Sequence, residues 1–169
     1  SLGIVSAQTK KFDYTSIVSV PDLSFFDDIY TGLDILEQMD FKFLINKKIG
    51  IFCNQTAVNR NDNHILDLIG KNPNIFIKAI FEPEHGIWGM DDKRAKLIGN
   101  QRVDPVSGAK VFNLLERSLY PPNWILKDLD LIVVDIQDTG ARYTTFIASI
   151  SKLFESASKH KIPIIILDR

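Results

Sequence analysis

One stretch of the chain, LDLIVVDI at residues 129–136, restricts the possible folds more than any other part of the sequence. It is continuously apolar and β-branched at its centre, which is typical of a parallel strand buried on both faces. An amphipathic segment follows at 144–161, and IPIIILD at 162–168 repeats the strand pattern. A strand, a helix and a second strand in this order form a βαβ unit, so the sequence predicts an α/β fold with a mostly parallel sheet.

Predicted strands and helices also alternate upstream of residue 129, which extends this prediction to a Rossmann-like sheet with helices on both faces. The apolar runs KKIGIFC (47–53) and IFIKAIF (75–81) read as two more strands, with short strands expected around Leu97 and Val111. Apolar residues at helical spacing predict a helix that starts at Ser24, and a second one capped by Asn61 or Asp62 that ends near Gly70. A short helix is expected over 123–127, after Pro121 and Pro122.

Composition excludes several classes of protein. The 169 residues carry a formal net charge of −1. The chain therefore lacks the excess of basic residues that would indicate a nucleic-acid partner. No apolar run approaches the roughly 20 residues of a membrane-spanning helix. The single cysteine, Cys53, cannot form an internal disulfide, and the sequence leaves the oligomeric state open.

The two ends of the chain carry their own expectations. Residues 1–24 read as an irregular segment, and SLGIVSAQ resembles the tail of a secretory signal, so we expect a signal-peptide remnant and a periplasmic or secreted protein. Residues 25–169 read as one Rossmann-like catalytic domain. Because the run IPIIILDR stops on a strand pattern, we expect this domain to be truncated at its C-terminal end.

Polar residues follow each of the four main predicted strands directly. In an open parallel sheet, ligands bind outside the carboxyl ends of the strands, so we expect these residues to form one site. The clusters are Asn54, Gln55 and Thr56; Glu82, Glu84 and His85; Asp135, Gln137, Asp138, Arg142 and Tyr143; and Asp168 and Arg169.

The run EPEHG at 82–86 indicates acid–base chemistry. Pro83 restricts the backbone around Glu82, and Gly86 permits turns that other residues resist. A rigid Glu84–His85 pair at a strand end suits general acid–base catalysis, and a second carboxylate after the third strand suits glycoside hydrolysis.

Several alternatives remain open for these residues. Asp135 fits a helix cap, Asp138 fits a structural ion pair with Arg142, and Asn54 to Thr56 fit a simple turn. Trp88 fits either the core or a stacking surface for a sugar ring, and both His64 and His160 fit structural or solvated positions.

The same residues include possible metal ligands, but the sequence carries no metal or cofactor motif. Glu84, His85, Asp135 and Asp138 are suitable metal ligands, but no HExxH or spaced histidine pair occurs. The sequence also lacks the GxGxxG, P-loop and GxSxG motifs, so neither a metal nor a nucleotide cofactor is expected.

Several of these strings together resemble one family, the NamZ-type exo-β-N-acetylmuramidases. The matching strings follow in the family's order from about Gly32 to Arg169: GLDIL, KKIGIFCNQTAV, FEPEHGIWG, VDPVSG, DLDLIVVDIQDTGARYTTF and IPIIILDR. The resemblance implies a Rossmann-like N-terminal domain, a smaller second domain and an active site between them. It also implies release of terminal N-acetylmuramic acid from peptidoglycan fragments, without a cofactor.

On this resemblance, roles are expected for individual residues. Glu84 is the expected general acid/base, His85 would orient it or bind substrate, and Asp138 or Asp135 would be the second carboxylate. The catalytic set is therefore Glu84, His85 and Asp138. The expected substrate-binding residues are Asn54, Gln55, Thr56, Glu82, Trp88, Asp135, Gln137, Arg142 and Tyr143.

The chain departs from the family pattern in three places. NLLER at 113–117 stands where the family has Leu-Tyr-Gly, Phe146 replaces another aromatic residue, and the chain stops at LDR where the family continues with Pro-Asn-Pro. The first and third departures favour one alternative, a module or inactive fragment that binds muramyl sugars without cleaving them. A metal-dependent hydrolase is a second alternative, which does not rest on these departures.

Overall fold

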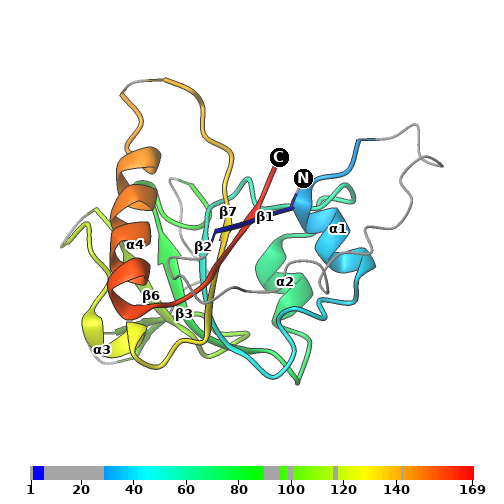
Figure 1. Ribbon diagram of the computed structural model, residues 1–169, viewed down its shortest axis with the longest axis horizontal. Helices are drawn as coiled ribbons and strands as arrows, with labels where there is room; N and C mark the ends of the chain where they lie inside the picture. The colour runs from blue at the N-terminus through cyan, green and yellow to red at the C-terminus, as the bar shows by residue number, and fades with distance from the viewer. Residues whose placement is uncertain (1, 6–28, 90–95, 99–100, 116–117, 142) are drawn as a thin grey trace.

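The computed structural model of the chain describes residues 2–5, 29–89, 96–98, 101–115, 118–141 and 143–169 (Figure 1). Its elements, in chain order, are β1 (Leu2–Val5), α1 (Gly32–Gln38), β2 (Lys48–Cys53), α2 (Ile65–Ile69), β3 (Phe76–Glu82), β4 (Lys96–Ile98), β5 (Gln101–Val103), β6 (Lys110–Asn113), α3 (Asn123–Leu126), β7 (Leu131–Asp135), α4 (Phe146–His160) and β8 (Ile164–Leu167).

The described strands form one 8-stranded sheet in the order β1-β8-β7-β2-β3-β6-β5-β4. The strands from β8 to β6 in this order run parallel to their neighbours. Strand β1 and the β4–β5 hairpin add antiparallel edges on the two sides. The predicted α/β fold with a mostly parallel sheet is therefore confirmed, and β4 and β6 form where short strands were expected.

Helices cover both faces of this sheet, as the sequence predicts. Successive side chains of a strand point to opposite faces, so a strand buried on both sides contributes to two cores. In β7, Val133 packs in the core that includes α1 and α2, whereas Ile132 and Val134 pack in the core that includes α3 and α4. Figure 1 shows the two helix pairs on opposite sides of the sheet.

Helix α1 begins later than the sequence predicts. Its N-cap is Thr31, whose hydroxyl accepts a hydrogen bond from the Asp34 N–H while the Asp34 carboxylate accepts one from the Thr31 N–H. This capping box fixes the start of the helix at Gly32. The expected cap Ser24 lies outside the described residues.

The start of helix α2 also differs from the prediction. Its N-cap is His64, and neither Asn61 nor Asp62 takes that place. The His64 ring accepts a hydrogen bond from the Leu66 N–H at 3.3 Å, which is the bond that an Asn or Asp cap would otherwise accept. Gly70 ends the helix, as expected.

The N-terminal segment is not irregular throughout, so this part of the prediction is wrong. Residues Leu2–Val5 form β1 and pair in antiparallel register with β8, from Leu2 opposite Leu167 to Val5 opposite Ile164. The remainder of the predicted irregular segment lies outside the described residues. Among the helices that the structure describes, none has the length and apolar character needed to cross a membrane.

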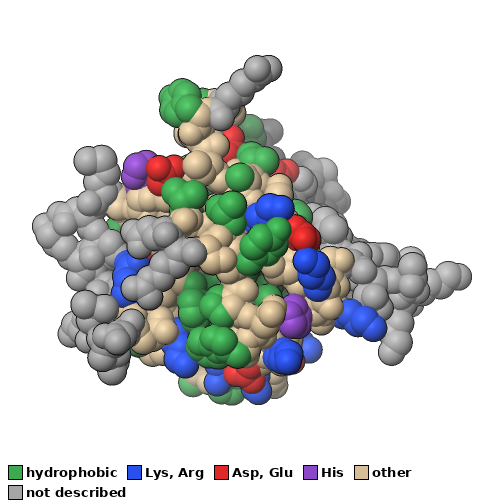
Figure 2. Space-filling view, turned by 90° about the vertical axis from the view of Figure 1, so that its left-hand side faces the viewer, with side chains coloured by type: hydrophobic (Ala, Val, Ile, Leu, Met, Phe, Trp, Pro, Cys, Tyr) green, Lys and Arg blue, Asp and Glu red, His purple; other side chains and the backbone are tan. Residues whose placement is uncertain are grey.

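The outer surface of α3 and α4, which faces the viewer in Figure 2, combines apolar and basic side chains. Trp124 is half-exposed, with the Lys110 ammonium 4.4 Å from its ring centroid. The Lys152 ammonium lies 5.1 Å from the ring centroid of Tyr120, whose hydroxyl donates a hydrogen bond to Glu155. These cation–π contacts account for aromatic rings that remain partly in water.

Candidate active site

The carboxyl ends of the parallel strands meet at one edge of the sheet. In the observed register, Phe52 lies opposite Phe81, Cys53 opposite Asp135, and Val134 opposite Ile166. The segments that follow β2, β3, β7 and β8 therefore start at the same level, as the sequence predicts.

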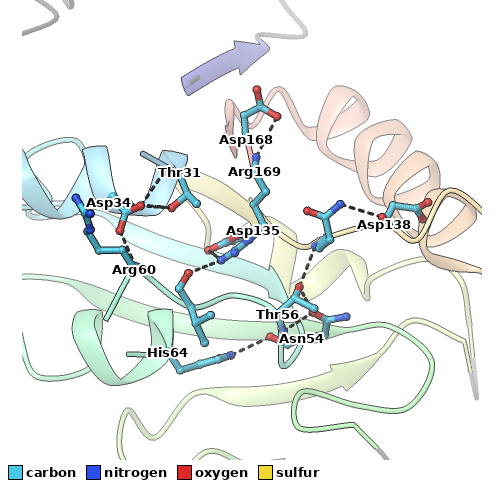
Figure 3. A network of polar contacts seen from close by, with 12 residues as sticks. Thr31, Asp34, Asn54, Thr56, Arg60, His64, Asp135, Asp138, Asp168 and Arg169 are labelled. Carbon is cyan, nitrogen blue, oxygen red and sulfur yellow. Dashed lines mark hydrogen bonds and ion pairs between the residues drawn. The ribbon is translucent and has the colours of Figure 1, made fainter. Parts of the chain in front are cut away.

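The turn after β2 is tied to the loop after β7 (Figure 3). The buried Asn54 side-chain oxygen accepts hydrogen bonds from the Thr56 N–H at 2.9 Å and the Thr56 hydroxyl at 2.6 Å. The same hydroxyl accepts the Gln137 N–H at 2.9 Å. Asn54 and Thr56 thus form a turn, and that turn positions a second loop. Gln55 is exposed beside this turn.

His64 belongs to this network, although the sequence predicted only a structural or solvated position on a helix. It is buried, and its Nε2 lies 2.9 Å from the Asn54 carbonyl oxygen. Since Nδ1 accepts the Leu66 N–H, the hydrogen bonds assign a neutral ring with the proton on Nε2. Its ring centroid is 4.3 Å from that of Trp88, so His64 connects the turn after β2 to the loop after β3.

Trp88 was predicted either to pack in the core or to form a stacking surface for a sugar ring. It is partly buried and packs against the core on the α1 and α2 side. The same residue contacts the His64 ring at the edge that carries the candidate site. Its packing role is thus observed, whereas its role with substrate stays a prediction.

Asp135 is fully buried at the end of β7 and pairs with Arg169. The Arg169 Nε donates to Asp135 Oδ1 at 2.7 Å, and Nη2 donates to the Val58 carbonyl at 2.8 Å (Figure 3). Burial raises the pKa of Asp135 from 3.8 to about 6, although the Arg169 guanidinium acts in the opposite direction. Asp135 does not cap a helix, and its observed function is to join β7 to the segment after β8.

Glu82 is also fully buried, at the end of β3. Its Oε1 forms an ion pair with Arg102 on β5 and accepts a hydrogen bond from the Asn113 amide at 3.3 Å. The other carboxylate oxygen, Oε2, has no hydrogen-bond partner among the described residues. Glu82 therefore holds β5 and β6 against β3, and its expected contact with substrate stays a prediction.

Glu84 and His85, which follow soon after Glu82, differ in burial and in their contacts. Glu84 is half-buried, and its Oε2 accepts a hydrogen bond from the Thr145 hydroxyl at 2.8 Å. His85 is exposed and has a φ of 70°, a left-handed conformation that is uncommon for residues other than glycine. Strained backbone of this kind often occurs at functional sites. Within the described part of the chain, Glu84 is thus oriented by Thr145, and no bond from His85 orients it.

The loop after β7 carries the remaining predicted residues. Asp138 Oδ1 accepts the Gly140 N–H at 2.6 Å, and its buried Oδ2 has no hydrogen-bond partner among the described residues. Tyr143 is 88% exposed, so its aromatic ring is accessible to a ligand. Arg142 lies outside the described residues, and with it the expected ion pair to Asp138.

The sequence missed residues that act through long-range contacts. These are Thr145, His64, Arg102 and Asn113, each of which contacts a predicted site residue from another part of the chain. The polar character of His64 before the apolar run ILDLI was the one local signal available. In the described ranges, no group of three or more His, Cys, Asp or Glu side chains is arranged to hold a metal ion.

Comparisons with known proteins agree on one family. The model of the exo-β-N-acetylmuramidase NamZ N-terminal domain matches residues 49–169. The chain is 34% identical over 141 residues to the peptidoglycan β-N-acetylmuramidase NamZ of Bacillus subtilis, covering 83% of this chain and 34% of the relative. The chain therefore spans about a third of the length of this relative.

Two crystal structures of DUF1343 family proteins from Bacteroides fragilis share the fold. The first has a TM-score of 0.71 and 33% identity, covering 83% of this chain and 34% of the solved one. The second has a TM-score of 0.66 and 31% identity, covering 84% and 35%. At these identities the similarity extends to both fold and family.

Proposed function

Because this chain belongs to the family of NamZ N-terminal domains, we propose that it forms the N-terminal part of an exo-acting β-N-acetylmuramidase. The proposed reaction releases terminal N-acetylmuramic acid from peptidoglycan fragments, as part of cell-wall turnover. Peptidoglycan fragments are therefore the proposed partner, and the oligomeric state is left open.

The observation that carries this proposal is the position of Glu84. It follows the buried end of β3, at the edge where the strand ends meet, and Thr145 holds one of its oxygens. A half-buried carboxylate in such a position suits proton transfer to or from a glycosidic oxygen. We propose Glu84 as the general acid/base.

The second carboxylate is proposed to be Asp138. Asp135 is fully buried against Arg169, whereas Asp138 lies in the loop after β7 with one oxygen not used by the described residues. Glycoside hydrolysis commonly uses two carboxyl groups on either side of the bond that is cleaved. The sugar-binding roles of Asn54, Gln55 and Tyr143 are part of the same proposal.

The experiment is a hydrolysis assay with a chromogenic β-N-acetylmuramide, run on the complete gene product. We expect Glu84→Gln to lower kcat by about 10²- to 10⁴-fold, because general acid–base catalysis contributes that much. Glu155→Gln is the matched control, since it makes the same chemical change on the outer surface of α4 and should retain wild-type kcat. Full activity of Glu84→Gln would rule out the proposed catalytic role.

The assay also separates the rival functions. The short span relative to the Bacillus subtilis protein favours testing the 169-residue chain alone as a sugar-binding module. Calorimetric binding of N-acetylmuramic acid without hydrolysis by either form would support that module. Loss of hydrolysis on addition of a chelator would instead support a metal-dependent hydrolase.

A further inference from the structure

Thr145 makes a hydrogen bond that links two distant parts of the candidate site. Its hydroxyl donates to Glu84 Oε2 at 2.8 Å, although the two residues are 61 positions apart in the sequence. Thr145 stands at the N-terminal end of α4, and Glu84 lies in the loop after β3. The bond therefore connects the proposed general acid/base to the start of a helix.

The hydroxyl of Thr145 is not used in the way that is usual for its position. Thr145 is the N-cap of α4, where a threonine oxygen normally accepts a hydrogen bond from an N–H of the first helical turn. In this structure it makes no such bond to the helix. The described contact of the Thr145 hydroxyl is therefore the bond to Glu84 and not a capping bond to the helix.

This geometry orients the Glu84 carboxylate. A hydroxyl that donates to a carboxylate forms a short and comparatively strong bond, which restricts rotation of the acceptor. Among the described residues, no hydrogen bond is made to the other oxygen, Oε1. The Thr145 bond therefore occupies Oε2 and leaves Oε1 available to a ligand.

We infer that Thr145 is a positioning residue that holds Glu84 in its reactive orientation through the hydroxyl bond to Oε2. This inference rests on the proposed function, because it assumes that Glu84 reacts. Thr145 acts through Glu84, so its loss affects turnover more than substrate affinity. A misplacement of about 1 Å in a reacting group can lower a rate about 10²-fold.

The test compares four variants of the complete gene product by their kcat and KM on the chromogenic muramide. We expect Thr145→Val to lower kcat about 10- to 100-fold with KM within about twofold of wild type. Thr145→Ser keeps the hydroxyl and should restore kcat to within about threefold of wild type. Thr144→Val is the matched control, because the neighbouring Thr144 hydroxyl donates to the Ala141 carbonyl and not to Glu84.

The fourth variant, Thr145→Gly, guards against a folding defect. Glycine is well tolerated at an N-cap, so this variant removes the hydroxyl while the helix start is kept. It should reproduce the loss of kcat seen with Thr145→Val. A wild-type kcat in Thr145→Gly, or a loss in Thr145→Ser equal to that in Thr145→Val, would overturn the inference.

A double variant distinguishes this inference from the proposed function. If Thr145 acts through Glu84, adding Thr145→Val to Glu84→Gln should lower kcat no further, since the two changes remove one shared interaction. An additive loss would overturn the positioning role while the catalytic role of Glu84 stands. Full activity of Glu84→Gln alone would instead contradict the proposed catalytic role of Glu84, on which this inference rests.

Discussion

Asp135 is a carboxylate that the fold buries together with its counter-ion, and this burial has a consequence for stability. Its pKa is raised to about 6 in the folded protein by burial, from the ordinary 3.8. Between these two values the folded protein retains a proton that the unfolded chain has released. The contribution of Asp135 therefore makes the free energy of unfolding fall as the pH rises from about 4 to about 6, with no further change above that range.

We predict that Asp135→Asn removes this pH dependence. The difference in unfolding free energy between wild type and variant should fall by about 2 kcal/mol between pH 4 and pH 7, as measured by urea denaturation. Asp62→Asn makes the same chemical change on an exposed turn and should leave the shape of the curve as in wild type. A difference that stays constant or grows with pH would contradict the prediction.

The individual site residues could be predicted from the sequence better than their contacts. Glu84, Asn54 and Asp138 lie at the expected edge because strand ends can be read from apolar runs. Their partners could not be read, because Thr145 and Arg169 approach from 61 and 34 positions away. Side chains that meet through tertiary structure leave no local pattern in one sequence.

At the scale of elements, the start of α1 is fixed by its contact with β8. The Gly32 N–H donates to the Asp168 carbonyl at 2.6 Å. A Cβ at position 32 would lie 2.7 Å from Asp168 N and from Leu167 Cα, which are backbone atoms that cannot rotate away. Glycine is therefore required at this position by the close approach of the helix to the strand.

We predict that Gly32→Ala destabilises the protein by about 1–3 kcal/mol, as overpacking does in other cores. This loss is expected even though alanine favours helix formation over glycine by about 1 kcal/mol. Urea denaturation of Gly32→Ala and of Gln38→Ala measures the effect, since Gln38 is exposed on the same helix and should tolerate alanine. An equal or higher stability of Gly32→Ala would show that the helix can move away from β8.

Strands and helices differ in how well their limits could be predicted. Strands β2, β3, β7 and β8 lie within about two residues of their apolar runs, because burial on both faces requires an uninterrupted run. Strand β5 has no such run, and the sequence did not predict it. The helix starts were predicted less accurately than the strand limits. The observed caps are Thr31 and His64, whereas residue type alone also favours Ser24, Asn61 and Asp62 as caps.

At the scale of the whole molecule, the sheet order divides the structure into a centre and two edges. Strands β7, β2 and β3 are paired on both sides and buried on both faces. Strand β1 and the β4–β5 hairpin are joined to the sheet through antiparallel pairing at its edges. Local opening is therefore easier at the edges than at the centre.

We predict a matching gradient in amide hydrogen exchange. The amides of β2, β3 and β7 should exchange most slowly, near the rate set by global unfolding, and those of β1 and β4 most quickly among the strands. The amide of the exposed residue Thr139 provides the fast reference within the same sample. Protection of β4 equal to that of β7 would contradict the gradient.

The contacts of Arg169 also bear on the order in which the molecule assembles. Arg169 reaches Val58 across 111 positions and Asp135 across 34, and it is synthesised after every other residue of the candidate site. A charged Asp135 buried without this counter-ion would cost several kcal/mol, so the packed end of β7 depends on the segment after β8. During synthesis, this edge can therefore reach its final packing only once residue 169 has been added to the chain.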